Sequence, residues 1–385
     1  MAAERVRAYQ RCTVTVMDTT DPDITFDENG VSSYVGMFTR NVEPVLRRAQ
    51  AGERLAERDA LVARIKADGR GKPYDVVIGV SGGVDSTFLT LSAVRLGLRP
   101  LLVHFDSGWN SEAAVDNIHN LVTSLGLDLY TQVVDWREMK DLQLSFLKSG
   151  TANADTPTDH AFGYVSYSQA QKYGIKHILA GFNFVSESIL PTAWGYTSAD
   201  AKLLRSIQRR FGTVKLKTYP VMGQLTRTLW YPYVRRIETH SLLNFAPYHY
   251  DQAKAEISAE VGWRDYGGKH YESVFTRWFQ GYYLPQRFGF DKRLAHYTSL
   301  ILAGEMTRDE ALEKLDSTNY PDELRAQDHE FMAKKLGITV AELDAIVASP
   351  PRDYTDYPNS EKSTKAVFDV TTRVGAAVAR LRGSR

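Results

Sequence analysis

The chain has 385 residues, and its 47 basic and 46 acidic side chains give a formal net charge of +1, which leaves no electrostatic footprint for nucleic acid. Its single cysteine, Cys12, excludes an internal disulfide and an all-cysteine zinc site within one chain. The N-terminus lacks the apolar core of a signal peptide and no apolar run approaches the roughly 18 residues of a membrane span, so we expect a soluble, cytoplasmic protein without membrane insertion.

Residues 1–72 are expected to form a mixed N-terminal segment, in which the turn-rich stretch "DPDITFDENGV" precedes a charged helical stretch. The sequence "GRGKP", Gly69–Pro73, is typical of a hinge into the next unit, which we place at residues 73–230. Strands are expected there at "YDVVIGVS", "RPLLVHFDS", "LDLYTQVVD" and "KHILAGFN", with helices between them. Near-continuous apolar strands joined by helices predict an α/β fold with a doubly wound, mostly parallel, Rossmann-like sheet. The carboxyl ends of its strands should then share one edge, where ligands bind.

The alternation ends after about Ser198, and residues 231–385 are predicted to form a mostly helical, aromatic-rich extension that binds substrate. Two stretches, Thr307–Leu315 and Thr339–Val347, begin with Thr-x-x-Glu, the capping-box signature of a helix start. The 21 tyrosines and 6 tryptophans lie mostly after Tyr130. They fit either a core whose hydroxyl groups reach partners at its edges or a wet pocket for a polyhydroxylated ligand.

The most informative stretch is the hexapeptide "SGGVDS", which joins the first expected strand to the next helix. Gly82 and Gly83 allow tight backbone angles and the close approach of an anion to main-chain N–H groups, and the helix adds its N-terminal dipole. Ser81 and Ser86 can donate hydroxyl groups, and Asp85 can hold Mg²⁺ beside phosphates. The stretch has neither Walker A nor dinucleotide Gly-x-Gly-x-x-Gly spacing. It therefore predicts a polyphosphate site of another type.

This hexapeptide resembles the SGGxDS loop of the ATP-pyrophosphatase (PP-loop) superfamily, whose fold is adenine nucleotide alpha hydrolase-like. The resemblance implies that ATP is split between its α and β phosphates while the loop holds pyrophosphate and a substrate oxygen is adenylated. A nitrogen or sulfur nucleophile then displaces AMP. The cofactors implied are ATP and Mg²⁺.

Two further strand ends carry polar residues. His104 and Asp106 end the second strand, where such enzymes usually bind adenosine, although a satisfied histidine and a turn aspartate would explain them equally simply. After the fourth strand, Gly181 permits close approach, and Asn183 and Glu187 are expected at the same edge. Polar strand ends that meet a phosphate loop predict a site by convergence.

The composition also bears on the nucleophile. A lone Cys12 cannot form a sulfur relay, and a net charge near zero argues against tRNA as the substrate. Nitrogen remains, but Cys12 stands in no setting typical of a glutaminase nucleophile. Ammonia should therefore come from a partner protein or from solution.

Longer segments, including "VHFDSGWNSEAAVDNIHNLV", "ESILPTAWGYTSAD", "GWRDYGGKHYESVFTRWFQGYYLPQRFGFDKRLAHYTSLILAGEMTRDEAL" and "DYTDYPN", resemble the N-acetyl sugar amidotransferase family of lipopolysaccharide O-antigen biosynthesis. The resemblance runs from about Asp18 to Asn359. It implies conversion of an acetamido group on a UDP-linked diacetamido uronic acid to an acetamidino group. The implied partners are a glutaminase that supplies ammonia and a barrel-like subunit.

The sequence departs from this family at its N-terminus. Family members commonly carry cysteines on both sides of "ITFDENGV", as in a small zinc knuckle, whereas this chain keeps Cys12 and has Ser32, Ser33 and Tyr34 after it. Because serine is a poor zinc ligand, zinc is doubtful there and we carry no metal over.

The candidate residues fall into two further groups. The catalytic candidates lie on the loop, after the fourth strand, and in two later stretches: Asp85, Asn183, Glu187, Lys202, Lys269 and His270. The basic candidates for binding phosphate or the sugar carboxylate are Lys202, Arg205, Lys215, Lys217 and Arg264, and Asp265 and Glu272 are further candidates for binding the substrate. Solvated surface charge explains each isolated lysine or arginine equally well, and "WRDYGGKHYES" could be a plain loop before a helix.

Two other functions remain open. The chain could be a different ATP-pyrophosphatase ligase that forms an amide or amidine on a small carboxylate or a tRNA base. It could also be a nucleotide-binding scaffold without catalysis, although the intact loop, with both serines and the aspartate, argues against that function.

Overall fold

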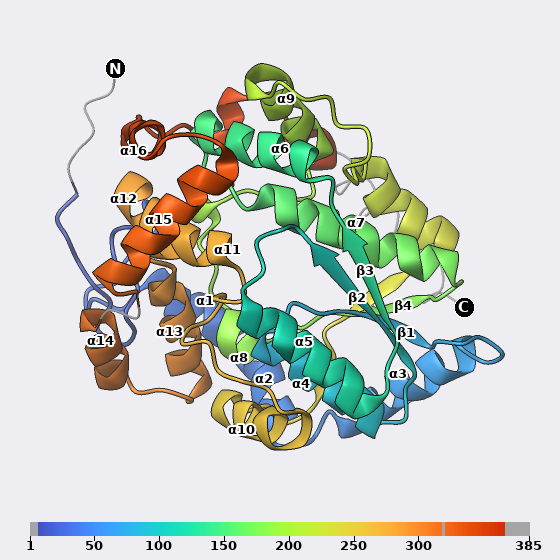
Figure 1. Ribbon diagram of the computed structural model, residues 1–385. Helices are drawn as coiled ribbons and strands as arrows, with labels where there is room; N and C mark the ends of the chain where they lie inside the picture. Colours follow the sequence, from blue (N-terminus) through green and yellow to red (C-terminus); the bar gives the residue numbers. More distant parts are fainter. Residues whose placement is uncertain (1–6, 318–319, 366–385) are drawn as a thin grey trace.

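The computed structural model describes residues 7–317 and 320–365 (Figure 1). Its centre is one parallel sheet of five strands in the order β3-β2-β1-β4-β5. The strands are β1 Val76–Gly79, β2 Pro100–Asp106, β3 Leu129–Val133, β4 His177–Leu179 and β5 Glu238–His240. This sheet confirms the doubly wound parallel fold expected from the sequence. It also takes in β5, which lies beyond residue 230.

The apolar sequences of the central strands explain their position. Val76, Val77 and Ile78 of β1 are completely buried, and β1 pairs in parallel with β2 on one side and with β4 on the other. The edge strand β3 alternates between half-buried and exposed residues. Chain order reverses between β1 and β4, so the loops after these two strands form the switch point where open α/β sheets bind ligands.

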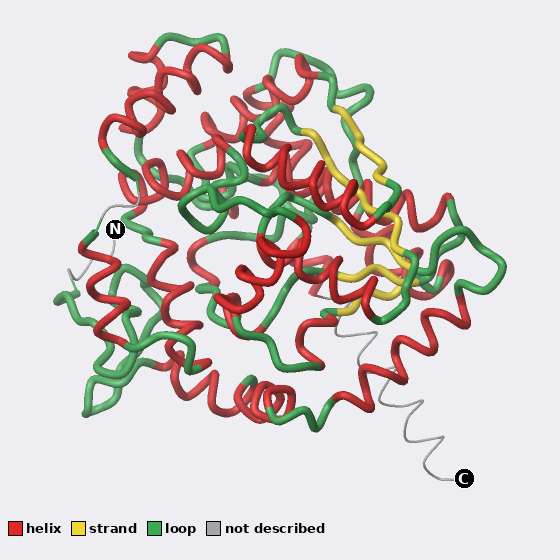
Figure 2. The backbone as a smooth tube through the Cα atoms, turned by 60° about the horizontal axis from the view of Figure 1, so that its bottom comes forward, coloured by secondary structure: helices red, strands yellow, loops and turns green. Residues whose placement is uncertain are grey.

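Helices cover both faces of the sheet, whose yellow strands lie in the right half of Figure 2 with red helices on either side. Helix α7 contacts β1, β2 and β4, while α4 contacts β1 and β2 and is itself covered by α5 and α10 (Figure 1). Outside this core, α6 packs on both α7 and α9. The helices up to this point are α1 Ser33–Asn41, α2 Glu43–Gln50, α3 Leu55–Asp68, α4 Val84–Arg95, α5 Glu112–Leu125, α6 Trp136–Ser149, α7 Thr156–Lys172, α8 Phe184–Glu187, α9 Ala201–Phe211 and α10 Tyr250–Val261.

The C-terminal part is helical, as expected, and α13 packs against the short helix α8 that follows β4. Its helices are α11 Val274–Trp278, α12 Leu284–Phe288, α13 Lys292–Ala303, α14 Arg308–Asp316, α15 Asp322–Leu336 and α16 Val340–Ala348. Both expected capping boxes are present, at Thr307 with Glu310 and at Thr339 with Glu342. Two π-helical turns, Thr226–Arg235 and Phe279–Tyr283, were not expected from the sequence.

Cys12 lies where the N-terminal segment is held in place. Its thiol is fully buried, and its sulfur accepts hydrogen bonds from the backbone N–H groups of Thr15 at 3.3 Å and Ser32 at 3.2 Å. The Arg308 guanidinium, on α14, donates to the carbonyl oxygens of Cys12 and Thr15. The segment is therefore fastened to the C-terminal helices.

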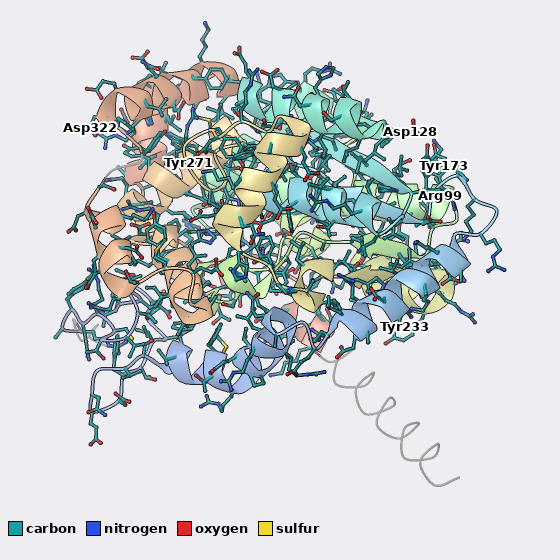
Figure 3. The ribbon with its side chains drawn as sticks, turned by 90° about the horizontal axis from the view of Figure 1, so that it is seen from below. Arg99, Asp128, Tyr173, Tyr233, Tyr271 and Asp322 are labelled. Carbon is teal, nitrogen blue, oxygen red and sulfur yellow. The ribbon has the colours of Figure 1, made fainter. Side chains whose placement is uncertain are left out.

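The amino ends and the carboxyl ends of the strands face different parts of the molecule. Arg99 and Asp128 precede β2 and β3, and Figure 3 shows them together with Tyr173 on one side of the molecule. Tyr271 and Asp322, from the C-terminal helical region, lie on the other side. The C-terminal region therefore adjoins the edge that holds the carboxyl ends of the strands.

Candidate functional site

The hexapeptide loop takes the conformation that its glycines suggested. Gly82 has a φ of +83°, and a Cβ atom there would lie 2.6 Å from the carbonyl oxygen of Ala114 on α5. The Ser81 hydroxyl accepts the N–H of Gly83 at 3.3 Å, and the Ser86 hydroxyl donates to the Gly83 carbonyl at 3.2 Å. Helix α4 begins directly after Gly83, so its N-terminal N–H groups face the loop.

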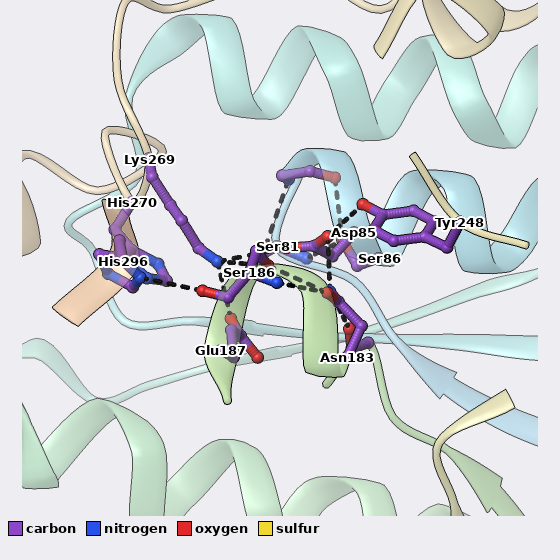
Figure 4. Close-up of polar contacts among 12 residues, drawn as sticks. Ser81, Asp85, Ser86, Asn183, Ser186, Glu187, Tyr248, Lys269, His270 and His296 are labelled. Atoms are coloured by element: carbon purple, nitrogen blue, oxygen red, sulfur yellow. Dashed lines mark hydrogen bonds and ion pairs between the residues drawn. The ribbon is translucent and has the colours of Figure 1, made fainter. Parts of the chain in front are cut away.

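Asp85 is the centre of a polar network (Figure 4). Its Oδ1 accepts hydrogen bonds from Asn183 Nδ2 at 2.9 Å and from the Tyr248 hydroxyl at 2.5 Å. Its Oδ2 lies 3.7 Å from the Lys269 ammonium. Burial raises the pKa of Asp85, and the nearby Lys269 charge opposes this rise. A cation in this site would favour the ionised carboxylate further.

Lys269 joins the loop to the segment that follows β4. Its Nζ lies 3.1 Å from Glu187 Oε1 and donates to the Ser186 hydroxyl at 2.9 Å. The ammonium therefore stands between two carboxylates, those of Asp85 and Glu187 (Figure 4). Residues after β1, after β4 and before α11 thus meet in one place.

His270 and Glu272 form the next part of this wall. His270 has a φ of +66°, which is unusual for a residue with a side chain and is found mainly where the surroundings impose it. Its Nδ1 lies 3.6 Å from Glu272 Oε1. Burial alone would raise the pKa of Glu272, but His270, a backbone hydrogen bond and the Tyr266 hydroxyl together outweigh this and leave the pKa below its ordinary value.

These groups surround a cavity of about 220 Å³, which we call the loop cavity. Among the residues that line it are Ser81, Gly83, Asp85, Ser86, Gly181, Glu187, Lys269, His270 and Glu272. Gly181 lies against the start of α4, and a Cβ atom there would be 3.4 Å from the Ser86 nitrogen. The structure thus brings together most of the residues that the sequence analysis assigned to phosphate binding and catalysis, with Asn183 behind Asp85.

A larger cavity of about 530 Å³ adjoins the loop cavity and shares Lys269 with it. We call it the helical cavity, because the C-terminal helices supply most of its wall. Among the side chains that line it are Tyr271, Lys292, Arg293 and Tyr297, together with the acidic Asp291, Asp322 and Glu323, and Arg293 is paired with Asp291 at 2.8 Å. His296 lines it as well.

His296 was not singled out from the sequence. Its Nδ1 lies 3.3 Å from the Ser186 carbonyl, so Nδ1 carries the proton and donates it, and Nε2 is left as a buried acceptor without a hydrogen-bond partner among the described residues. Burial lowers the pKa of His296 well below its ordinary value, and the Lys269 charge adds to this effect. The ring is therefore a neutral base beside the shared lysine.

Tyr248 was also missed, although it donates directly to Asp85. Tyr250 and Tyr266, which line the loop cavity, were missed as well. The sequence signal was only the general abundance of tyrosine, which does not say which hydroxyl groups reach the site.

His104 and Asp106 do not line the loop cavity. His104 is buried, with Nδ1 2.9 Å from the Val80 carbonyl and Nε2 2.9 Å from Asn110 Nδ2, so both ring nitrogens are engaged. Asp106 Oδ1 accepts the N–H of Gly108 at 2.9 Å, as a turn aspartate does. In this structure the hydrogen bonds of both residues stabilise the end of β2 and the turn that follows it.

The basic candidates on and after α9 also lie apart from the loop cavity. Lys202, Arg205, Lys215 and Lys217 are exposed and do not line it, as surface charges would behave. In the "WRDYGGKHYES" stretch, Arg264 is exposed, and Asp265 forms an ion pair with Lys254 at 2.5 Å. From this stretch, Tyr266, Lys269, His270 and Glu272 reach the loop cavity, whereas Arg264 and Asp265 do not line it.

The donor set can accommodate a hard divalent cation. Asp85 and Glu187 both line the loop cavity and offer carboxylate oxygens, which Mg²⁺ prefers. Lys269, the cation that now lies between them, is a flexible side chain that can turn toward a phosphate oxygen instead. The residues present therefore fit Mg²⁺.

The fold and this site define an open α/β protein in which the Ser81–Ser86 loop and the start of α4 lie at the switch point of a parallel sheet. Residues 272–371 match the family model described as "LPS biosynthesis protein WbpG-like, C-terminal domain". This match confirms the resemblance to proteins of lipopolysaccharide biosynthesis, and the matched segment includes Glu272 and much of the wall of the helical cavity.

The comparison with solved structures adds little. NMN synthetase from Francisella tularensis is 16% identical over 58% of this chain and 92% of its own, with a TM-score of 0.27. A TM-score this low carries no argument. The chain matches no curated protein. In the described part of the chain, no helix has both the length and the apolar character needed to cross a membrane.

Proposed function

We propose that this protein is an ATP-dependent amidotransferase that converts an acetamido group of a UDP-linked diacetamido uronic acid to an acetamidino group in lipopolysaccharide O-antigen biosynthesis. The observation that carries the proposal is the loop cavity, in which an anion-binding loop, two carboxylates and a lysine converge. The WbpG-like match of the adjoining C-terminal segment supports lipopolysaccharide biosynthesis as its setting.

ATP is proposed to place its β and γ phosphates on the loop. The N–H groups at the start of α4 and the hydroxyl groups of Ser81 and Ser86 are donors suited to phosphate oxygens. Asp85 and Glu187 would hold Mg²⁺, which supplies compensation for the charge of the departing pyrophosphate. Lys269 is then placed to bind the α-phosphate or the developing leaving group.

The chemistry requires activation because an amide carbon is a poor electrophile. The amide oxygen attacks the α-phosphorus of ATP, the bond to pyrophosphate breaks, and an O-adenylyl imidate forms. Ammonia adds to the imidate carbon, loses a proton, and AMP departs with the former amide oxygen, leaving the amidine. Donors fixed around the phosphates stabilise the charge that develops in both steps.

The sugar nucleotide is proposed to occupy the helical cavity. This cavity shares Lys269 with the loop cavity, so a ligand there can present its acetamido group to the α-phosphate. Lys292 and Arg293 suit the diphosphate or the uronate, and the tyrosines suit the rings.

His296 is proposed to orient ammonia by accepting a hydrogen bond from it, since its lowered pKa makes the ring a weak base. Its unpartnered Nε2 is a neutral acceptor on the wall of the helical cavity, near the lysine that the two cavities share. His270, whose ring centroid lies 5.3 Å from that of His296, and Glu187 are the candidates for accepting the proton that ammonia loses. Ammonia itself would come from a partner glutaminase with a barrel-like subunit.

The direct test incubates the protein with ATP, Mg²⁺, ammonium and a UDP-linked diacetamido uronic acid. The expected products are AMP, pyrophosphate and a sugar whose mass has changed by the replacement of oxygen with an NH group. With oxygen-18 in the amide, the label should appear in AMP. ADP as the product, or AMP without the label, would contradict the mechanism.

Asp85→Asn should abolish AMP formation while leaving the fold intact, because it keeps the shape of the side chain and removes its charge. The matched control is Asp116→Asn, which changes an exposed carboxylate on α5 in the same way. Equal activity of the two variants would remove Asp85 from the mechanism.

A further inference from the structure

Three possible metal ligands lie together on the sheet, away from the residues discussed above. His177 is on β4, and Glu238 and His240 are on β5. The two strands pair in parallel with His177 opposite Glu238 and Leu179 opposite His240. Because alternate residues of a strand share a face, all three side chains project from the same face of the sheet.

The distances between their ligand atoms are those of a metal site. His177 Nδ1 lies 3.1 Å from His240 Nε2, which lies 3.6 Å from Glu238 Oε2. All three ligand atoms lie within 4.8 Å of one another. Tetrahedral zinc, with bonds of about 2.0–2.1 Å, separates its ligand atoms by about 3.3 Å. The two distances from His240 Nε2 already lie within a few tenths of an ångström of this separation, and a movement of the exposed Glu238 side chain would bring its carboxylate into coordination with both imidazoles.

A carboxylate outside the cluster orients the first imidazole. Asp68, at the end of α3, places its Oδ2 3.0 Å from His177 Nε2, so this nitrogen carries the proton. The lone pair of Nδ1 then points toward His240. A carboxylate that holds the far nitrogen of a ligating histidine is a recurring feature of metal sites.

The nearby charges are balanced. Arg64 pairs with Glu238 at 2.9 Å, and Lys176 pairs with Asp68 at 2.8 Å. The Arg64 side chain is half exposed and can turn into solvent when Glu238 binds a cation. Without a metal, His240 Nε2–H can donate to His177 Nδ1, so the arrangement is stable in advance of binding.

From this geometry we propose that His177, Glu238 and His240 bind a divalent transition metal, with zinc as the best match for two imidazoles and one carboxylate. Three protein ligands leave a fourth position for water. The metal would fasten β5 to β4 directly before the loop cavity. The two strands are already joined there, because the backbone N–H of Ala180, the residue after β4, donates to the His240 carbonyl at 3.0 Å. This site does not depend on the proposed reaction.

The test uses the full chain after removal of metals with a chelator. Cobalt(II) serves as the probe, because tetrahedral coordination gives it visible absorption, and zinc should displace it at one equivalent. Zinc should also raise the midpoint of thermal unfolding. Glu238→Gln and His240→Gln should each weaken cobalt binding at least tenfold and abolish the thermal shift.

Two control variants should behave like the unmodified protein. His119→Gln removes an exposed histidine on α5, and Cys12→Ser removes the sole thiol, which is the other possible soft ligand. Failure of the unmodified protein to bind one equivalent of cobalt would overturn the proposal. Undiminished binding by Glu238→Gln and His240→Gln, or binding lost in Cys12→Ser, would also overturn it. Glu238 is exposed enough for its replacement to spare folding, so the test does not rest on the His240 variant alone.

Discussion

Replacing Gly82 with alanine tests how closely the loop is built against its neighbours. Its φ of +83° is a left-handed conformation, which costs a residue with a side chain about 1–2 kcal/mol. The new Cβ would also lie 2.6 Å from the carbonyl oxygen of Ala114, an atom of the α5 backbone that cannot rotate away. The loop or the helix must therefore move.

A matched variant separates the loss of unfolding free energy into a part from the backbone conformation and a part from steric overlap. Gly126 ends α5 with a φ of +61°, and a Cβ atom there would meet nothing within 4 Å. Gly126→Ala should therefore lose only the conformational part, about 1–2 kcal/mol of unfolding free energy. Gly82→Ala adds the overlap, which by analogy with overpacked cores costs about 1–3 kcal/mol more. Its total loss should be about 2–5 kcal/mol.

Urea unfolding of both variants measures this difference, and pyrophosphate release measures its consequence for function. Because the loop must shift away from α5, its N–H groups should no longer be aimed at phosphate, and the rate should fall about a hundredfold. Gly126→Ala should keep its rate. The reasoning is refuted if Gly82→Ala is no less stable than Gly126→Ala, or if it releases pyrophosphate as fast as the unmodified protein.

Three further predictions concern other parts of the molecule. Tyr248→Phe removes a hydrogen bond to a carboxylate worth about 1.5–3 kcal/mol, so AMP formation should fall about tenfold or more. The control Tyr233→Phe, at an exposed tyrosine, should leave the rate unchanged. Equal rates for the two variants would show that the Tyr248 hydroxyl does not support Asp85. Burial lowers the pKa of His160 in the folded protein. The contribution of this histidine to the unfolding free energy is therefore fully present above its unfolded pKa of about 6.5 and is lost as the pH falls below that value. His160→Gln should reduce the slope of unfolding free energy between pH 6.5 and 5 by up to about 1.4 kcal/mol per pH unit, and parallel curves for the two proteins would argue against this origin. Arg308→Gln should expose the N-terminal segment to proteolysis sooner than Arg47→Gln, at an exposed arginine, and similar cleavage rates would show that the guanidinium does not hold the segment.

The sheet and its loop could be predicted because their signals are local. Apolar runs such as Val76–Ile78 and the Thr-x-x-Glu starts at Thr307 and Thr339 need only neighbouring residues to be interpreted. The strand β5 was missed for the same reason. Glu238–His240 is short and polar, and it is a strand only because β4 offers it an edge.

The rest of the site depends on contacts between distant residues. Asn183 could be expected beside the loop because it follows a parallel strand, but Tyr248 is 163 residues from Asp85 and follows no strand end, so no sequence pattern pairs it with that carboxylate. For His104 the sequence left two interpretations open, an adenosine contact and a satisfied histidine. Both of its ring nitrogens have partners at the strand end, Val80 and Asn110, which the sequence pattern did not indicate, and the adenosine contact stays a prediction.

The cluster around Lys269 indicates why the sheet alone is not a complete site. The loop supplies donors and one carboxylate, and the segment after β4 supplies a second carboxylate, so a phosphate would meet negative charge on two sides. Lys269, which balances this charge, lies in the segment before α11, and this segment follows the last strand of the sheet in the sequence. Because the same lysine also lines the helical cavity, the C-terminal part of the chain both completes the phosphate site and forms the space beside it. A protein that held only a nucleotide would need the first of these features, whereas one that joins a nucleotide to a second substrate needs both.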